Sequence, residues 1–360
     1  MLHPGMPHRS WLVASLIALA AGTGCSDSTH DASASDGGPP EPTGDSGTAT
    51  SGHEVTLLAS LGGSSYSFQI DSTSAYALLV DTEGNDSTTV VKVPLAGGTP
   101  QTLASDPQYA DGLAVYGGTV YWVDPSGPAN DASPEDSGLV MSAPTAGGVA
   151  ATLASDQGLP ENIAVDSSGV YWVNGVGCLQ SSCVTATGAV MMLPPGGTTP
   201  TVLATTIAAP EALALDATNV YWGTDDGRVM KVAKSGGTVT TLAYYQASIQ
   251  NLVVGPSDVY WTTGTGDIMQ TPIAGGTSTA IVVGTASILG LAIDGTNLYW
   301  ITYEDTENDV NASTVNRMAL GGGTPTALWA GSDTPEAIQV DGTSVYFATS
   351  SGNLFKLTPK

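Results

Sequence analysis

A tyrosine that usually follows Val or Leu and usually precedes Trp recurs along this chain, and it constrains the fold more than any other feature. Seven such tyrosines are spaced by 45, 50, 50, 39, 39 and 47 residues: Tyr76, Tyr121, Tyr171, Tyr221, Tyr260, Tyr299 and Tyr346. Trp follows the middle five, while Ala77 follows the first and Phe347 the last. A period of this length indicates an array of similar modules, each too small to bury a core alone.

Each module contains four short strand-like segments. In the fourth module these are Leu213–Asp216, the run around Tyr221, Val229–Val232 and Thr240–Ala243, with a Gly-Gly turn before the last one. Paired glycines permit the positive φ angles of a tight hairpin. Four strands in roughly 40–50 residues are typical of a propeller blade. The sequence therefore predicts an all-β, seven-bladed β-propeller built from four-stranded antiparallel blades.

The seventh module lacks a fourth strand, because Lys360 follows soon after its third strand, Leu354–Leu357. A segment with the fourth-strand pattern, Val55–Ala59, precedes the first module instead. We expect this N-terminal strand to pair with the C-terminal blade and to close the ring. Closure would remove two sheet edges that are otherwise open to aggregation.

The N-terminal region has the composition of a targeting segment and a tether. Arg9 precedes an apolar run, Trp11–Ala21, that is too short to span a bilayer. The end of residues 1–25 resembles a bacterial lipobox, although Gly22 stands where a Leu-like residue is usual. The resemblance implies lipidation of Cys25. Ordinary signal-peptidase cleavage nearby is the alternative. Residues 26–52 are rich in Ser, Asp, Gly and Pro, which predicts a disordered tether. Residues 53–360 form the predicted propeller.

The repeat resembles the YWTD propellers of lipoprotein-receptor ectodomains, here in a bacterial lipoprotein form. The resemblance covers about residues 53–360 and depends on the Tyr-Trp pairs and the upstream Ala-Val-Asp strand, as in 164–166. Those receptor propellers have six blades, and their Thr-Asp is mostly replaced here, so the resemblance implies the fold rather than receptor-type binding. A seven-bladed ring is also similar to streptogramin-lyase-like propellers, whose chemistry depends on a channel histidine.

Several repeated or paired residues are predicted to be structural. Each Trp should pack between neighbouring blades, where a large aromatic side chain joins the sheets. The Asp that ends the first strand in five of the seven modules should accept backbone N–H bonds in a turn. Cys178 and Cys183 lie in one long insertion, and a disulfide between them is expected in an oxidising compartment.

One face of the ring should carry the variable loops. These are the connections between the second and third strands of a blade, and those that lead into each first strand. The long insertions all fall there, and several are acidic: Asp124–Gly138 with Asp131, Glu135 and Asp136; Asn174–Gly188; and Thr302–Ser313 with Glu304, Asp305, Glu307 and Asp309. Variable loops on a rigid ring are the usual place for binding.

The start of each first strand places one residue at the mouth of the central channel on that same face. In blade order these are Tyr66, Asp111, Glu161, Glu211, Gln250, Leu289 and Glu336. We predict ligand binding by Asp111, Glu161, Glu211, Gln250 and Glu336. The four acids among them, Asp111, Glu161, Glu211 and Glu336, are a candidate Ca²⁺ site, since Ca²⁺ takes six to eight oxygen ligands. The alternative is that Pro-Glu before a strand is simply a solvated turn.

Charge and motif content restrict the function. With 33 acidic and 8 basic residues, the chain is unsuited to nucleic acid, and we expect membrane contact only through the lipid anchor. No catalytic residue is assigned, because the histidines, His3, His8, His30 and His53, all lie outside the repeats. The sequence favours a binding or scaffold module, outer-membrane-anchored and periplasmic or surface-exposed, for an envelope protein, a glycan or a small ligand. A hydrolase or lyase using Glu161 and Glu211, and a purely structural envelope protein, are the alternatives.

Overall fold

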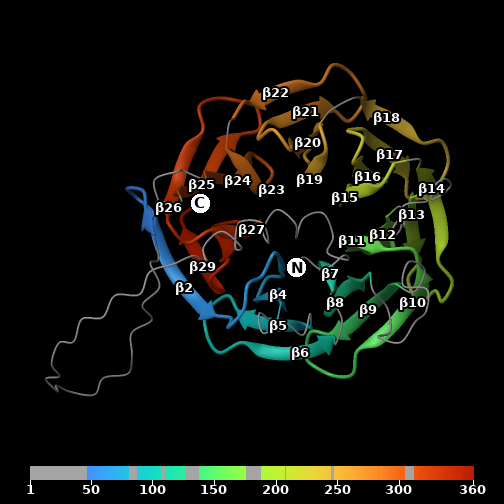
Figure 1. The fold of residues 1–360 in the computed structure, drawn as a ribbon, viewed down its shortest axis with the longest axis horizontal. Helices are drawn as coiled ribbons and strands as arrows, with labels where there is room; N and C mark the ends of the chain where they lie inside the picture. The colour runs from blue at the N-terminus through green and yellow to red at the C-terminus, as the bar shows by residue number, and fades with distance from the viewer. Residues whose placement is uncertain are drawn as a thin grey trace, which may run out of the picture.

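The computed structural model describes residues 47–80, 87–106, 110–125, 138–175, 188–206, 208–244, 247–284, 286–304 and 312–360. All regular elements in these ranges are strands, and none of these residues belongs to a helix that could cross a membrane. The strands form seven antiparallel sheets, arranged as blades around a central axis (Figure 1). The predicted all-β, seven-bladed propeller is confirmed.

In each blade the first strand lies next to the axis and the last strand lies at the outer rim (Figure 1). The first four blades are β3 (Ser67–Ile70), β4 (Ser74–Val80), β5 (Thr88–Pro94) and β6 (Gln101–Asp106); β7 (Asp111–Tyr116), β8 (Thr119–Asp124), β9 (Gly138–Pro144) and β10 (Ala151–Gln157); β11 (Pro160–Asp166), β12 (Gly169–Asn174), β13 (Gly188–Leu193) and β14 (Thr201–Thr206); and β15 (Pro210–Leu215), β16 (Asn219–Thr224), β17 (Val229–Ala233) and β18 (Thr240–Ala243). The other three are β19 (Ile249–Val254), β20 (Asp258–Thr263), β21 (Ile268–Pro272) and β22 (Thr279–Val282); β23 (Ser287–Ile293), β24 (Asn297–Glu304), β25 (Ala312–Ala319) and β26 (Thr326–Gly331); and β27 (Pro335–Val340), β28 (Val345–Thr349), β29 (Asn353–Thr358) and β2 (Glu54–Ser60).

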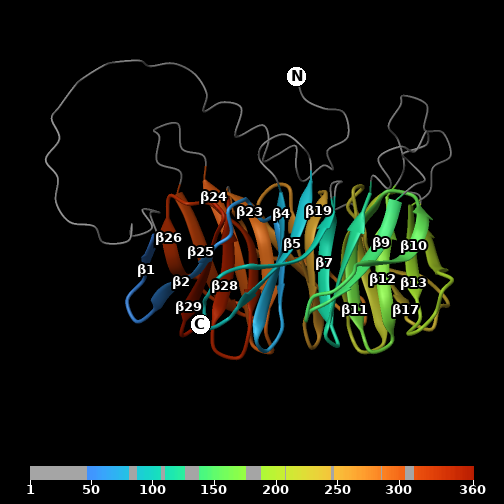
Figure 2. The same cartoon turned by 90° about the horizontal axis from the view of Figure 1, so that it is seen from below.

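The ring closes through the N-terminal strand, as the sequence predicted. Strand β2 pairs antiparallel with β29, with Val55 opposite Leu357 and Leu57 opposite Phe355. In Figure 2 the blue β2 crosses the red blade 7 at the rim of the disc. The last blade is thereby completed by residues from the other end of the described chain.

A second N-terminal strand, β1 (Thr48–Ala49), adds a fifth strand to blade 6, with Ala49 opposite Trp329 of β26. Gly47 lies directly on the Trp329 ring: its φ is +61°, and a Cβ there would come within 2.3 Å of that ring. Residues 47–52, assigned to the tether from sequence, thus include a strand on the propeller, because glycine allows this close approach. Residues 1–46, including the predicted signal segment and Cys25, lie outside the described residues.

Seven apolar clusters join the seven pairs of adjacent blades. The repeated tryptophans Trp122, Trp172, Trp222, Trp261 and Trp300 are at most 2% exposed, and each lies in the cluster shared with the preceding blade. Around Trp222, for example, Tyr171 and Val173 come from blade 3, while Val220 and Val232 come from blade 4. The predicted structural role of the Trp repeat is confirmed.

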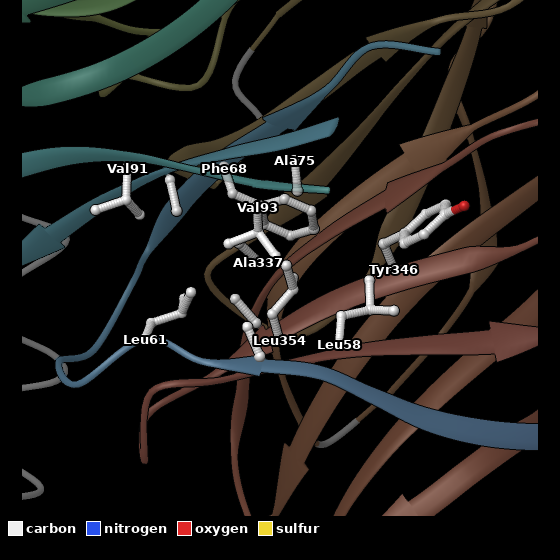
Figure 3. Packing of buried hydrophobic residues seen from close by; sticks show 12 residues of the cluster. Leu58, Leu61, Phe68, Ala75, Val91, Val93, Ala337, Tyr346 and Leu354 are labelled. Atoms are coloured by element: carbon white, nitrogen blue, oxygen red, sulfur yellow. The ribbon is translucent and has the colours of Figure 1, made fainter. Parts of the chain in front are cut away.

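The junction between blades 7 and 1 has no Trp and is filled differently. Ala77 stands at the Trp position, and Phe68 of blade 1 supplies the aromatic ring instead. Figure 3 shows Phe68 beside Val93 and Ala337, with Leu58 of the closing strand and Leu354 of β29 nearby. The closing strand therefore contributes to the core as well as to the sheet.

The predicted Asp turns are confirmed on the face opposite the mouth, which we call the lower face. The Asp216 carboxylate accepts backbone N–H bonds from Thr218 and Asn219, each at 2.6 Å, and the Tyr221 hydroxyl donates to it at 2.6 Å. Burial alone would raise the pKa of Asp216, but these hydrogen bonds outweigh it and lower the pKa to about 2. The same hydrogen bond from the Tyr hydroxyl to the turn Asp recurs in blades 1, 6 and 7. The repeated Tyr therefore stabilises the lower-face turn of its own blade.

Candidate functional site

A central cavity of about 550 Å³ lies on the axis of the ring, lined by the first strands of all seven blades. The residues predicted at the channel mouth all line it: Tyr66, Asp111, Glu161, Glu211, Gln250, Leu289 and Glu336. They come together because each inner strand begins on the same face, which we call the mouth face. Whether these residues bind anything stays a prediction.

A β-bulge turns most of these residues toward the axis. In blades 3, 4 and 7 the pairing of the first two strands shifts register across Glu161, Glu211 and Glu336, so each Glu is the extra residue of its strand. Comparable shifts fall on the mouth positions of blades 5 and 6, and on Gly112, next to Asp111, in blade 2. Bulges redirect side chains and are common next to binding sites. Sequence reasoning missed them, and the Pro before each of these three Glu residues is the signal that could have indicated them.

Three acidic residues occupy neighbouring blades and form one arc of the mouth: Asp111, Glu161 and Glu211. Gly175 leaves room for the Glu161 carboxylate, since a Cβ at that position would lie 2.5 Å from Oε1. The Ser248 hydroxyl donates to Glu211 Oε2 at 3.2 Å. These contacts hold two of the carboxylates in place at the cavity.

Glu336 differs from the other acids because it is buried. It is 9% exposed, and its Oε2 atom has no hydrogen-bond partner although it is shielded from solvent. In ring order its neighbours at the mouth are Leu289 of blade 6 and Tyr66 of blade 1. Burial, and secondly repulsion from Asp333, raise the pKa of Glu336 to about 7.

The described residues that line the cavity include acids and no base. Its charged lining residues are the four predicted carboxyls, and no Lys, Arg or His is among the described residues that line it. The described lining of the cavity therefore carries acidic side chains and no basic one.

The bases are engaged elsewhere. Lys234 pairs with Asp166, and Lys360 pairs with Asp294 at 2.6 Å; both bridges lie at lower-face turns. Lys92 and Lys231 donate to carbonyl oxygens of the next blade, at 2.9 and 2.7 Å. On the mouth face, Arg228 pairs with Asp226 at 2.9 Å. The fold thus separates basic side chains from the acids of the cavity.

The four predicted Ca²⁺ ligands line one cavity but do not form a compact cluster, and Ca²⁺ binding stays a prediction. Asp111, Glu161, Glu211 and Glu336 all line the cavity, yet nowhere in the described ranges do three His, Cys, Asp or Glu side chains come close enough together to hold a metal ion. The four acids come from separate blades around an open cavity, which keeps their carboxylates apart. The predicted disulfide between Cys178 and Cys183, and most of each acidic insertion, lie outside the described residues.

No protein-family model matches this chain, and no curated protein does. Among solved structures, it is similar to a catalytically inactive histidine-to-alanine variant of virginiamycin B lyase from Staphylococcus aureus with quinupristin. That match has 13% identity and a TM-score of 0.63 over 86% of this chain and 99% of the other. A structure of YCF48 bound to D1 peptide matches with 10% identity and a TM-score of 0.60 over 89% of this chain and 100% of the other.

These likenesses show the propeller fold. Proteins of both binding and lyase type share it, so the fold alone does not separate the two functions. A nidogen/laminin complex also matches, with 19% identity over 56% of this chain and 72% of the other, but its TM-score is 0.44. The YWTD type accordingly stays a resemblance of sequence.

Proposed function

We propose that this chain is a binding propeller that receives a ligand or partner segment in its central cavity from the mouth face. The observation that carries the proposal is the cavity itself: about 550 Å³, with four carboxyls at its mouth and no base among the described lining residues. Ligand sites are concave, few in number and hold a small set of placed polar groups. One similar propeller has a structure with quinupristin, and another has a structure bound to D1 peptide. These two structures support the proposal that a propeller of this kind holds a ligand.

A plugged cavity tests this proposal. Gln250→Trp would place a large ring at the mouth, and Val202→Trp is the matched control, because Val202 is 55% exposed on an outer strand. Each protein would be incubated with an extract of the envelopes in which it is made and weighed by native mass spectrometry. We expect the wild type and the control to show one additional species, heavier by the mass of a bound ligand, and the plugged protein to show none. Equal binding by all three would exclude the cavity as the site.

The proposed location is the bacterial envelope, with Cys25 lipidated and the propeller periplasmic or surface-exposed. The sequence of residues 1–25 and the acidic, base-poor domain support this location. Cys25→Ser should move the protein from the membrane fraction to the soluble fraction. Unchanged partitioning would contradict lipid anchoring and would leave the proposed cavity binding untouched.

A carboxylate-dependent hydrolase or lyase is the second candidate. It is favoured by the raised pKa of Glu336, about 7, because a general acid must hold its proton near neutral pH. Glu161 or Glu211 would then act as the second carboxylate across the cavity. A glycan turnover screen tests it: activity must appear in the wild type and disappear in Glu336→Gln and Glu161→Gln. Turnover that survives both substitutions would exclude this candidate.

A further inference from the structure

We propose that the cavity takes a neutral sugar, a short oligosaccharide whose hydroxyl groups bond to the amide side chains of the inner strands. This inference rests on the proposed binding function and names the ligand class. Its support is the polar chemistry of the cavity wall, the way in which two of its amides are held, and one tyrosine ring at the mouth.

The wall of the cavity is rich in uncharged polar side chains. Blades 1, 3, 5 and 7 contribute five amides to it: Gln69, Asn162, Gln250, Asn251 and Gln339. Ser67 and Ser248 add hydroxyl groups, and polar groups contribute more of the lining than apolar groups do. An apolar ligand would remove water from these groups without replacing its hydrogen bonds, which is unfavourable. The wall therefore favours a ligand that forms hydrogen bonds itself.

Two of the amides are held in fixed orientations by bonds between blades. Gln339 Nε2 of blade 7 donates to the Phe68 carbonyl oxygen of blade 1 at 3.2 Å, and Asn162 Nδ2 of blade 3 donates to the Glu211 carbonyl oxygen of blade 4 at 3.5 Å. A primary amide has a second N–H and a carbonyl oxygen with two lone pairs, so each of these bonds uses only part of the side chain. A side chain that is already ordered loses little conformational entropy when a ligand arrives. Both amides are therefore preorganised for hydrogen bonding at the wall.

The kinds of donor and acceptor on the wall point to hydroxyl groups on the ligand. The carboxylates of Asp111, Glu161 and Glu211 only accept hydrogen bonds, whereas the amides both donate and accept. A hydroxyl group matches both, because it carries one donor and two lone pairs on a single atom. The described lining includes no Arg or Lys that would pair with the phosphate or carboxylate of an anionic ligand. A neutral ligand with many hydroxyl groups fits this wall.

Tyr66 favours a cyclic sugar over an acyclic polyol. It lines the mouth in blade 1, and its hydroxyl donates to the carbonyl oxygen of Ala110, just before the first strand of blade 2. This bond fixes the aromatic ring at the wall of the cavity. The C–H face of a pyranose is apolar and packs on aromatic rings, while its hydroxyl groups point away from its edge. One fixed ring beside a wall of amides therefore matches the two kinds of surface that a sugar carries.

A glycan array probed with the full chain tests the ligand class. It would carry short neutral oligosaccharides, among them cellotriose, maltotriose and tri-N-acetylchitotriose, with trigalacturonate as the acidic arm and triglucosamine as the basic arm. Isothermal titration calorimetry would then measure the best neutral oligosaccharide against both charged trimers and against trialanine. We expect the neutral sugar to bind at least about tenfold more tightly than the other three.

Two sets of variants place the sugar in the cavity. Gln69→Leu removes one lining amide and should weaken the best neutral sugar about three- to tenfold, the effect of one lost neutral hydrogen bond. Gln101→Leu makes the same change at an exposed position on the outer strand β6 and should bind like the wild type. Tyr66→Ala should weaken binding more than Tyr66→Phe, which keeps the aromatic ring. Wild-type affinity in both Gln69→Leu and Tyr66→Ala would overturn the inference.

The measurements on the wild type do not need any variant to fold. Failure of every neutral oligosaccharide to bind, or tighter binding of a charged trimer or of trialanine, would overturn the sugar inference. The proposed cavity function stands in these cases if native mass spectrometry finds a bound species other than a sugar that Gln250→Trp loses. Absence of any bound species on the wild type would contradict both.

Discussion

Replacing Glu336 with Gln should stabilise the protein in a strongly pH-dependent way. The carboxyl is 9% exposed, and its pKa is raised from 4.5 to about 7, by burial first and by repulsion from Asp333 second. The folded state therefore binds this proton more tightly than the unfolded state does. Below about pH 4.5 the group is protonated in both states and carries no penalty. As the pH rises through about 7 the folded protein must either keep the proton or bury a charge, so stability falls.

The size of the effect follows from the shift. At 1.36 kcal/mol for each pKa unit, the full penalty is about 3 kcal/mol, and about 2–3 kcal/mol of it develops between pH 5 and pH 8. Glutamine has nearly the same shape and does not titrate, so the variant should gain this amount on the wild type over that interval. The comparison cancels the titration of all other groups, which both proteins share.

Urea unfolding at about pH 5 and pH 8, followed by circular dichroism, would measure the two free-energy differences. Glu54→Gln serves as the control, because its side chain is exposed on β2, and it should follow the wild type at both pH values. A gap between Glu336→Gln and the wild type that is equal at the two pH values would refute the reasoning. It would mean that Glu336 is ionised without cost, through a partner or solvent that reaches Oε2.

Three further substitutions test the ring itself. Trp222→Ala should cost about 3–5 kcal/mol in thermal or urea unfolding, because this fully buried side chain joins blades 3 and 4, whereas the exposed Val202→Ala should stay within about 0.5 kcal/mol. Leu58→Ala should cost about 2–5 kcal/mol, and hydrogen exchange should quicken first in β29; uniform quickening in all blades would contradict a local role in closure. Asp216→Ala should cost about 1–3 kcal/mol near neutral pH. Because the pKa of Asp216 is lowered to about 2, its contribution is complete above its ordinary pKa of 3.8 and is lost as the pH falls through about 2, so a gap that stays constant on acidification would count against it.

The ring could be predicted because each blade junction makes the same physical demand. A large side chain must fill the space between two twisted sheets, so Trp122 and Trp222 recur at one place in the module, and the closing strand repeats the pattern of a fourth strand. No comparable packing requirement predicts strand β1 from the sequence. Its two residues resemble the polar segment around them, and only the fit of Gly47 against Trp329 holds them to blade 6.

The positions of the site residues could be predicted from the sequence, but the burial of Glu336 could not. Glu161, Glu211 and Glu336 share the same Pro-Glu motif, and all three line the cavity from bulged strands. Only Glu336 is buried, since its ring neighbours are Leu289 and Tyr66 rather than further acids. Tyr66 comes from blade 1, which meets blade 7 only when the ring is closed. The Pro-Glu motif is a local pattern, and it does not show which residues of other blades will surround the glutamate in the closed ring.

The contacts of the described lysines explain why none of them lines the cavity. The third strands place their lysines at the lower ends of the blades, where Lys92 and Lys231 bond to carbonyls of the next blade and Lys234 and Lys360 bond to turn carboxylates. Each of these bonds ties a basic side chain into a blade or a junction between blades, so none is free to turn toward the axis. The described lining of the cavity therefore holds four carboxyls and no basic side chain.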